Sequence, residues 1–354
     1  MTEPVLVLAW LVLAHLVADF LLQTGWIVRA KSSHGRRALA GLLAHGFVVA
    51  LCLLPVAFAW GGPGWVFLLA SAVLHVLIDR LKVLLTRRAA LGALTAAHVR
   101  HEGPQPADHL GRAWTPWPAA LFVLDQVAHL AVAGIGWAVL LAPAVLQPGW
   151  VDAIDRLLGS WDRAGVHDVV SVAVVVAALA IANIPAASIF VAILVRPVEQ
   201  TEDETRWGSR AGPAVEPAPA PAVAETVPAV ATIEAETSRR WQVRIGPIDA
   251  SIKAEPTAPP ATTIVVPAAA PPPAQTARVG ATIGILERIL VVVFVLTGTE
   301  AAIGFVVAAK TLARFRLLDD RDFAEYYLLG TLASVAVGIV TALVGKAALG
   351  ALLA

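Results

Sequence analysis

The chain has 354 residues, of which 58% are hydrophobic and 15% charged, and its formal net charge is +0. Globular chains are about 45–50% apolar and about 25% charged, so this composition is typical of a membrane protein. Without net charge there is no broad electrostatic attraction to polyanions, and we expect no nucleic-acid partner. The single cysteine, Cys52, excludes an intrachain disulfide.

Seven apolar stretches are long enough, at about 20 residues each, to cross a bilayer as helices. They cover residues 4–23, 38–60, 64–86, 118–142, 168–195, 283–309 and 326–351. The first lacks a basic N-terminal region and a small-residue cleavage site, which favours a retained span over a signal peptide. The sequence therefore predicts an all-α, polytopic membrane helix bundle of about seven transmembrane helices.

Basic residues in short loops predict the orientation. The first loop holds Arg29, Lys31, Arg36 and Arg37, and the third holds six more basic residues between positions 80 and 112. Both loops are expected in the cytoplasm, with the N-terminus outside. A basic group that follows the sixth stretch, at Lys310, Arg314, Arg316 and Arg321, disagrees with this orientation. The alternative is a re-entrant segment around Thr297-Gly298-Thr299, and the side of the C-terminus stays open.

The segment 197–280 differs from the rest because Pro, Ala, Glu and Thr dominate it. It buries too little apolar surface to fold, which predicts a disordered linker. The expected organisation is a five-span module at 1–196, this linker, and a two-span module at 281–354. Within the linker, residues 241–245 are read as a short strand, a peptide-docking patch, or a chance apolar segment.

The main functional signal is a set of ionisable residues inside four of the apolar stretches. An ionisable group in hydrocarbon costs roughly 2.5–3.5 kcal/mol, so several together require one another, water or a metal. Residues four apart share a helix face. The set contains three such pairs and a lone histidine, namely His15 with Asp19, His75 with Asp79, Asp125 with His129, and His45.

The depth of these residues favours one shared site. At about 1.5 Å per residue along each helix, most of them fall at a similar distance from the cytoplasmic end of their span. The spans run in alternating directions, so unrelated positions would scatter in depth. We therefore expect a single polar site that spans one to four build in the cytoplasmic leaflet.

Imidazole and carboxylate together suit zinc, iron or manganese. All seven residues are candidate metal ligands, and Asp19, Asp79 and Asp125 are candidate catalytic bases. Seven groups exceed the usual complement of one ion, so some would support other ligands or hold a second metal. The alternative for any single pair is a structural hydrogen bond, and Asp79 could form an interfacial ion pair with Arg80 and Lys82.

Several other polar positions have weaker signals. Gln23 continues the His15–Asp19 stripe, and Gln126 adjoins Asp125, where it could orient a ligand from another helix. Glu300 is a second candidate functional carboxylate beside the Thr-Gly-Thr interruption. A stripe of small residues at spacing four predicts close helix packing; it comprises Gly330, Ser334, Gly338 and Ala342.

These segments resemble a bacterial inner-membrane family known as the domain-of-unknown-function 3307 family. The resemblance rests on HLVADFLLQ at 15–23, AHG at 44–46, His75 with DRLK at 79–82, and LDQVAH at 124–129. The distal segments GILER at 284–288 and AEY at 324–326 are also similar, whereas the linker is longer than the family's loop. The resemblance implies a multi-pass protein of the cytoplasmic membrane and implies no activity.

Three functions are consistent with this pattern. The first is a metal-dependent hydrolase of a lipid-type substrate, loosely analogous to small bacterial membrane hydrolases. The second is a proton- or ion-coupled carrier that uses the same groups as a relay. The third is a structural or assembly protein in which the polar groups only fasten helices. Membrane lipid is the expected partner, and protein partners stay open.

Overall fold

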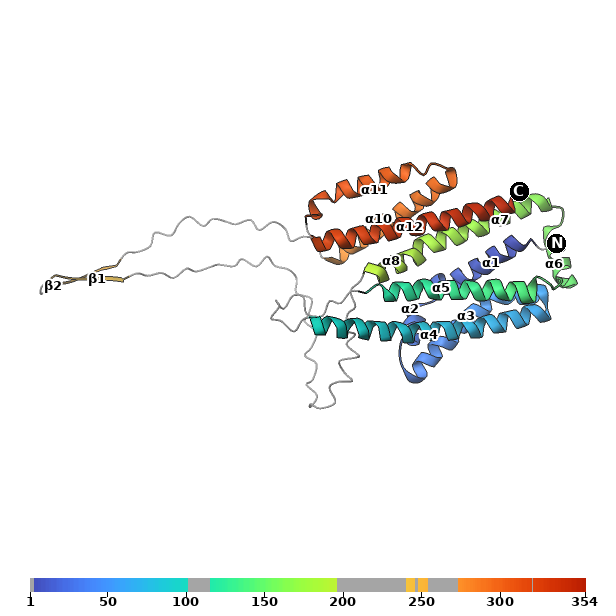
Figure 1. Cartoon of the computed structure of the whole chain (residues 1–354), viewed down its shortest axis with the longest axis horizontal. Coiled ribbons are helices and arrows are strands. Elements are labelled where there is room, and N and C mark those ends of the chain that lie inside the picture. The colour runs from blue at the N-terminus through green and yellow to red at the C-terminus, as the bar shows by residue number, and fades with distance from the viewer. Residues whose placement is uncertain (1–2, 101–114, 196–239, 246–247, 254–272, 320) are drawn as a thin grey trace. The chain divides into compact units, whose positions relative to one another are not determined.

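The computed structural model describes residues 3–100, 115–195, 240–245, 248–253, 273–319 and 321–354. The chain divides into two units, one made of residues 1–201 with 273–354, and the other of residues 202–272. Figure 1 shows the first unit as a bundle of helices, with both chain termini at the same end of it. The fold is an all-α bundle of membrane type, as the sequence predicts.

The helices of the first half follow the predicted spans and the turns between them. They are α1 Pro4–Leu16, η1 Val17–Leu21, α2 Gly25–Lys31, α3 Gly35–Trp60, α4 Gly62–Arg100, α5 Trp117–Gly136, η3 Trp137–Leu141, α6 Pro148–Leu158, α7 Arg163–Ile181, η4 Ala182–Ala186 and α8 Ala187–Val195. The segments η1, η3 and η4 are single π-helical turns that continue the helices before them. The remaining helices are α10 Pro273–Thr297, α11 Ala302–Ala313, the short 3₁₀ turn η5 Phe315–Leu317 and α12 Arg321–Leu352.

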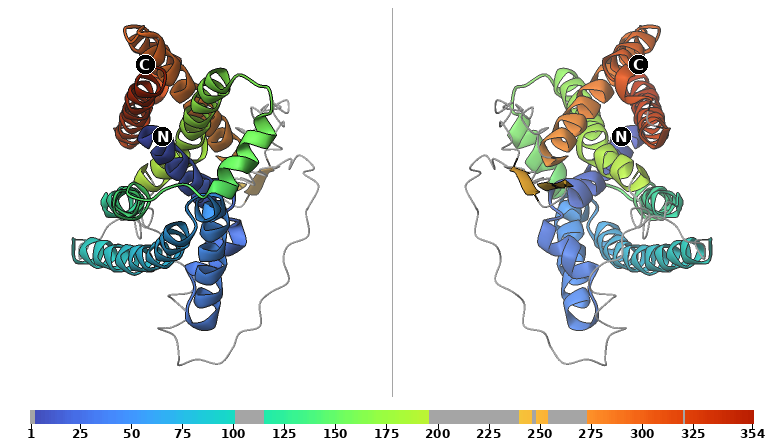
Figure 2. Two further views of the ribbon diagram at one scale, coloured as in Figure 1. Left: turned by 90° about the vertical axis from the view of Figure 1, so that its right-hand side faces the viewer. Right: turned by 90° about the vertical axis from the view of Figure 1, so that its left-hand side faces the viewer.

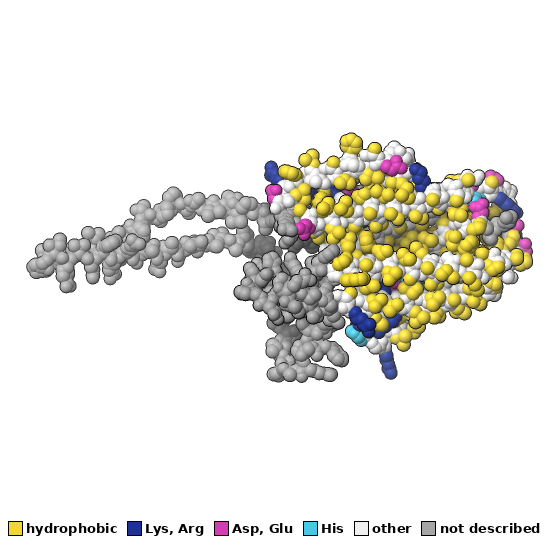
Figure 3. Space-filling view, in the orientation of Figure 1, with side chains coloured by type: hydrophobic (Ala, Val, Ile, Leu, Met, Phe, Trp, Pro, Cys, Tyr) yellow, Lys and Arg dark blue, Asp and Glu magenta, His cyan; other side chains and the backbone are white. Residues whose placement is uncertain are grey.

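Six helices of the described chain are long and apolar enough to cross a membrane. They are Pro4–Leu21, Gly35–Trp60, Trp117–Leu141, Arg163–Val195, Gly280–Thr297 and Ala324–Leu352. Hydrophobic side chains cover most of the visible face of this unit (Figure 3). The predicted span 64–86 lies within α4, which is not among the six, so the predicted count of seven is not confirmed.

Close backbone approaches hold α3 beside α4. Gly61 ends α3 with a φ of 61° and allows the chain to reverse into α4. A Cβ at Gly64 would lie 2.5 Å from the Val56 carbonyl oxygen, and one at Gly46 would lie 2.8 Å from Val76 Cγ2. The Gly64 contact brings the two backbones together near the turn, and the Gly46 contact brings α3 against α4 next to His45 and His75.

The short helix α2 returns against α3 rather than extending into solvent (Figure 2). Thr24 caps it by accepting a hydrogen bond from the Ile27 amide. A Cβ at Gly41 in α3 would lie 2.5 Å from the Lys31 amide nitrogen, so the two backbones touch there. Arg87 of α4 donates to the Ser32 carbonyl and so fixes the turn after α2. These contacts direct Lys31 toward the centre of the bundle, where its side chain is buried.

The predicted span 283–309 is wrong as a single helix. Helix α10 ends at Thr297, Gly298 has a φ of 72°, and α11 runs back along α10 (Figure 1). Lys310 of α11 consequently lies 2.6 Å from Glu287 near the middle of α10. The chain therefore reverses at Thr297-Gly298-Thr299, the position of the interruption noted in the sequence, and the basic residues after α11 return to the end where α10 begins.

The small-residue stripe on α12 is a packing surface, as predicted. Gly330 lies against Val195, Gly338 lies against Val291, and Ala342 is fully buried. Ser334, the remaining member, accepts a hydrogen bond from Arg288 at 3.0 Å.

The second unit contains an antiparallel hairpin of β1 Arg240–Ile245 and β2 Ile248–Lys253. Trp241 pairs with Ile252 and Val243 with Ala250. The segment predicted at 241–245 is therefore a strand. Most of the expected linker, 197–280, lies outside the described residues, and α10 begins within it at Pro273.

Replacing Gly41 by Ala is expected to destabilise the protein, because the new methyl group would overlap the α2 backbone. Overpacking of this kind costs about 1–3 kcal/mol, which should lower the melting temperature in detergent by several degrees. Gly134→Ala in α5 is the matched control, since nothing lies within 4 Å of its Cβ position. Equal melting temperatures for the two variants would contradict the close contact.

The α10–α11 hairpin predicts which positions share a side of the membrane. In a chain with Cys52 replaced by Ala, single cysteines at Ala281 and Arg316 should react with an impermeant maleimide from the same side. A cysteine at Thr299, in the turn after Gly298, should react from the opposite side. A single span over 283–309 would instead place positions 281 and 316 on opposite sides.

Candidate functional site

The structure brings the seven predicted residues into one cluster inside the first unit. α1 carries His15, η1 carries Asp19, α3 carries His45, α4 carries His75 and Asp79, and α5 carries Asp125 and His129. Six of the seven are buried, with exposed fractions from 0% at His45 to 8% at Asp19, and His15 is partly buried. Sequence spacing alone placed them on suitable helix faces, and the packing of α1, α3, α4 and α5 makes them contact one another.

Three potential ligand atoms lie closest together at Asp19. Its Oδ1 atom is 3.2 Å from His45 Nε2 and 3.1 Å from His75 Nε2. The two imidazole nitrogens are 2.9 Å apart. Zn–N and Zn–O bonds of about 2.0–2.1 Å place tetrahedral ligand atoms about 3.3 Å apart, close to these spacings.

The four imidazoles form a continuous row through the cluster. Ring centroids are 5.0 Å apart from His15 to His129, 3.9 Å from His129 to His75, and 4.9 Å from His75 to His45. His75 lies in the middle of the row and belongs to two groups of potential ligands. The ligand atoms of His15, His75 and His129 lie within 4.8 Å of one another, as do those of Asp19, His45 and His75.

Two of the three carboxylates are paired with lysines. Lys31 Nζ of α2 is 2.8 Å from Asp79 Oδ2, and Lys82 Nζ of α4 is 2.6 Å from Asp125 Oδ2. Asp79 Oδ2 also lies 3.4 Å from His45 Nε2. Each pair therefore lies beside the imidazole row, and Lys82, whose side chain is 26% exposed, is the more accessible of the two lysines.

Asp19 has no cationic partner of this kind among the described residues. The three carboxylates carry a charge of −3 and the two lysines +2, which leaves −1 in the cluster when the imidazoles are neutral. Three buried atoms also lack a hydrogen bond, namely Asp19 Oδ1, Asp125 Oδ1 and His129 Nδ1. A buried charge without a partner is costly, so this arrangement favours a bound cation or a proton.

A π-helical turn shapes the backbone at Asp19. In η1 the Leu22 amide donates to the Val17 carbonyl five residues earlier, at 2.9 Å. Such turns insert one residue into a helix and occur often at functional sites. The widened turn shifts the helix register between His15 and the residues that follow, and it brings Asp19 to His45 and His75.

Two glutamines complete the cluster. Gln126 Oε1 is 3.1 Å from His15 Nε2, and its Nε2 donates to Asp125 Oδ2 at 3.0 Å. Gln23 Nε2 is 3.1 Å from His45 Nε2. Gln126 therefore contacts a candidate ligand on a neighbouring helix, which was one of its predicted roles. Gln23 faces the cluster rather than water alone.

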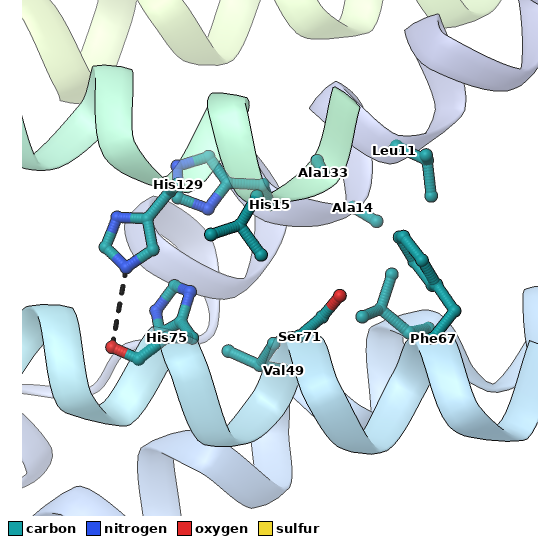
Figure 4. Close-up of a pocket in the computed structure, with 11 residues that line it drawn as sticks. Leu11, Ala14, His15, Val49, Phe67, Ser71, His75, His129 and Ala133 are labelled. Carbon is teal, nitrogen blue, oxygen red and sulfur yellow. Dashed lines mark hydrogen bonds between the residues drawn. The ribbon is translucent and has the colours of Figure 1, made fainter. Parts of the chain in front are cut away.

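A cavity of about 40 Å³ adjoins the imidazole row. Figure 4 shows His15, His75 and His129 at one end of it and Phe67 and Leu11 at the other. The dashed contact in Figure 4 joins His129 Nε2 to the His75 carbonyl oxygen at 3.5 Å. The cavity therefore leaves room for a small ligand beside three of the imidazoles.

Sequence reasoning missed Lys31 and considered Lys82 only as a partner of Asp79, an ion pair that the structure does not contain. Lys82 is three residues after Asp79 and shares its helix face, a signal that was present. Its partner is nevertheless Asp125 rather than Asp79, which requires the packing of α4 against α5. Nothing in the sequence indicates that Lys31 lies near Asp79, because its position depends on the return of α2 against α3.

Glu300 does not form a second buried site. It lies in the turn after α10 with its side chain 53% exposed, 4.0 Å from Lys346. The expectation of a deep carboxylate followed from the single span over 283–309, and it fails because that helix ends at Thr297.

Residues 7–148 match the family model described as protein of unknown function (DUF3307). This part of the chain is similar to that family. The match contains all seven residues of the cluster and both lysines, whereas the similarities noted at 284–288 and 324–326 lie beyond it. No curated protein and no solved structure matches the chain.

Removing Lys31 should leave Asp79 as an uncompensated buried charge. Breaking a buried pair from one side costs about 3–5 kcal/mol, so Lys31→Met should unfold at a clearly lower denaturant concentration than wild type. Lys31→Met combined with Asp79→Asn should recover part of the loss. Lys346→Met is the control, since that side chain is 48% exposed. A loss no larger than that of the control would contradict the assigned pair.

Proposed function

We propose that this protein binds a divalent transition-metal ion of the zinc, iron or manganese class in the buried His/Asp cluster. Asp19, His45 and His75 are the primary ligands. The observation that carries the proposal is Asp19, a buried carboxylate that has two imidazole nitrogens at 3.1–3.2 Å and no lysine partner among the described residues. A divalent cation would use all three ligand atoms and offset the surplus negative charge of the cluster.

The remaining members support this assignment in other roles. His15 and His129 extend the row of imidazoles from His75 and provide further ligand atoms. Asp79 and Asp125 are each held by a lysine, which suits residues that orient the centre better than direct ligands. Metal sites in helix bundles are commonly built from side chains on facing helices in this way.

The reaction class that fits best is hydrolysis of a lipid-type substrate. A bound metal would act as a Lewis acid and lower the pKa of water, which is the chemistry such a centre supplies. Asp125 or Asp79 could accept a proton once its lysine moves. The location of the centre inside apolar helices favours a substrate that reaches it from the membrane rather than from bulk water.

Elemental analysis of the purified protein tests the metal directly. We expect about one zinc, iron or manganese ion per chain, lost in Asp19→Asn, His45→Ala and His75→Ala. His167→Ala is the control, because His167 lies at the start of α7 with its side chain 31% exposed. Folded protein without metal after supply of each ion would refute the proposal, as would unchanged metal content in the three variants.

A proton-coupled carrier is the second candidate. It is favoured by the unbroken row His15–His129–His75–His45, whose last member also contacts Gln23. This function predicts flux in liposomes under a pH gradient, with loss in His75→Ala and no need for metal. The absence of flux in metal-free and metal-loaded liposomes would count against it. If both tests fail and the variants only lower the melting temperature, the cluster is structural.

A further inference from the structure

The cavity beside the imidazoles has a polar end and an apolar end. His15, His75, His129 and Ser71 supply its polar groups, and the other lining residues are Leu11, Ala14, Val49, Leu53, Phe67, Val132 and Ala133. Ser71 lies one helical turn before His75 on α4, and Figure 4 shows its hydroxyl between the imidazoles and Phe67. No hydrogen bond joins this hydroxyl to another described residue, so it is available to a molecule in the cavity.

The size of the cavity restricts its occupant. A water molecule needs about 10–15 Å³ of such volume and two to four polar partners. A cavity of about 40 Å³ therefore has room for two or three waters or one small linear ion, and it is too small for a lipid chain. Three imidazoles and Ser71 provide enough hydrogen-bonding groups to keep it hydrated.

The apolar end is closed by packing. Phe67 and Leu11 are 1% and 2% exposed. Gly136 of α5 lies against Phe67, and a Cβ there would be 2.7 Å from Phe67 Cε2. On α4, Phe67 precedes His75 whereas Asp79 and Lys82 follow it. The cavity and the two Lys–Asp pairs therefore lie on opposite sides of the imidazole row.

We propose that this cavity holds water or another small monodentate ligand that would meet the metal centre at His75, the one proposed primary ligand that lines it, and that Ser71 positions that ligand through its hydroxyl. The inference rests on the proposed metal function and specifies the geometry of the same site. Water held there would meet the centre from the apolar end of the cavity, on the side of the imidazole row away from Lys82.

The experiment uses the full-length protein loaded with Co²⁺, whose visible absorption reports its ligands, and azide as the small linear probe. Azide should change the cobalt spectrum with saturable binding. Ser71→Ala removes one hydrogen bond and should weaken azide binding about 2–10-fold. Ala133→Leu fills the cavity and should weaken azide binding more than tenfold, with cobalt affinity changed less than twofold.

Ala70→Leu is the matched control, because Ala70 is the neighbour of Ser71 on α4 and is exposed on the surface of the bundle. It should bind azide as wild type does. Cobalt-loaded protein in which Ala133→Leu and Ser71→Ala bind azide normally would overturn the cavity assignment and leave the metal site in place. Protein that binds no cobalt would overturn both proposals.

Discussion

The arrangement of helices in the first unit of this protein depends on the need to compensate the charge of buried carboxylates. Asp19, Asp79 and Asp125 lie inside a bundle of apolar helices, where an unpaired charge costs several kcal/mol. Two of the three are matched by lysines that come from different elements, α2 and α4. The return of α2, the glycine contact at Gly41 and the π turn at Asp19 all serve to bring these groups to the same place.

The C-terminal helices also bury a charged group, but its partners are neutral. Arg288 of α10 is 3% exposed and donates to the Asn183 carbonyl, Ser188 and Ser334. Its neighbour Glu287 pairs with Lys310, not with Arg288 as adjacency in the sequence suggests. Every nitrogen of this guanidinium has a neutral acceptor, and the result fastens η4, α8, α10 and α12 together. An arrangement in which each nitrogen has an acceptor within the protein is typical of a structural role.

The sequence predicted what depends on local spacing and missed what depends on chain reversal. The i, i+4 spacing of His15 with Asp19 and of Asp125 with His129 predicted shared helix faces, and counting residues along each span predicted similar depth. The hydropathy of residues 283–309 could not reveal that Gly298 reverses the helix, since α11 is as apolar as a continued span. The same limitation hid Lys31, whose contact with Asp79 joins residues 48 positions apart.

The surroundings of Arg288 and of Asp19 differ, and this difference is the strongest reason to assign the two residues different roles. Around Arg288 the hydrogen-bonding capacity is used within the protein. Around Asp19 the capacity is used only in part: Oδ1 makes no aligned hydrogen bond to the two imidazole nitrogens at 3.1–3.2 Å, His129 Nδ1 has none, and Ser71 and three imidazoles line the adjoining cavity. A cluster that only fastened helices would gain stability by satisfying these atoms or by replacing them with apolar residues. Its unsatisfied ligand atoms therefore support the proposed metal ion over a purely structural role.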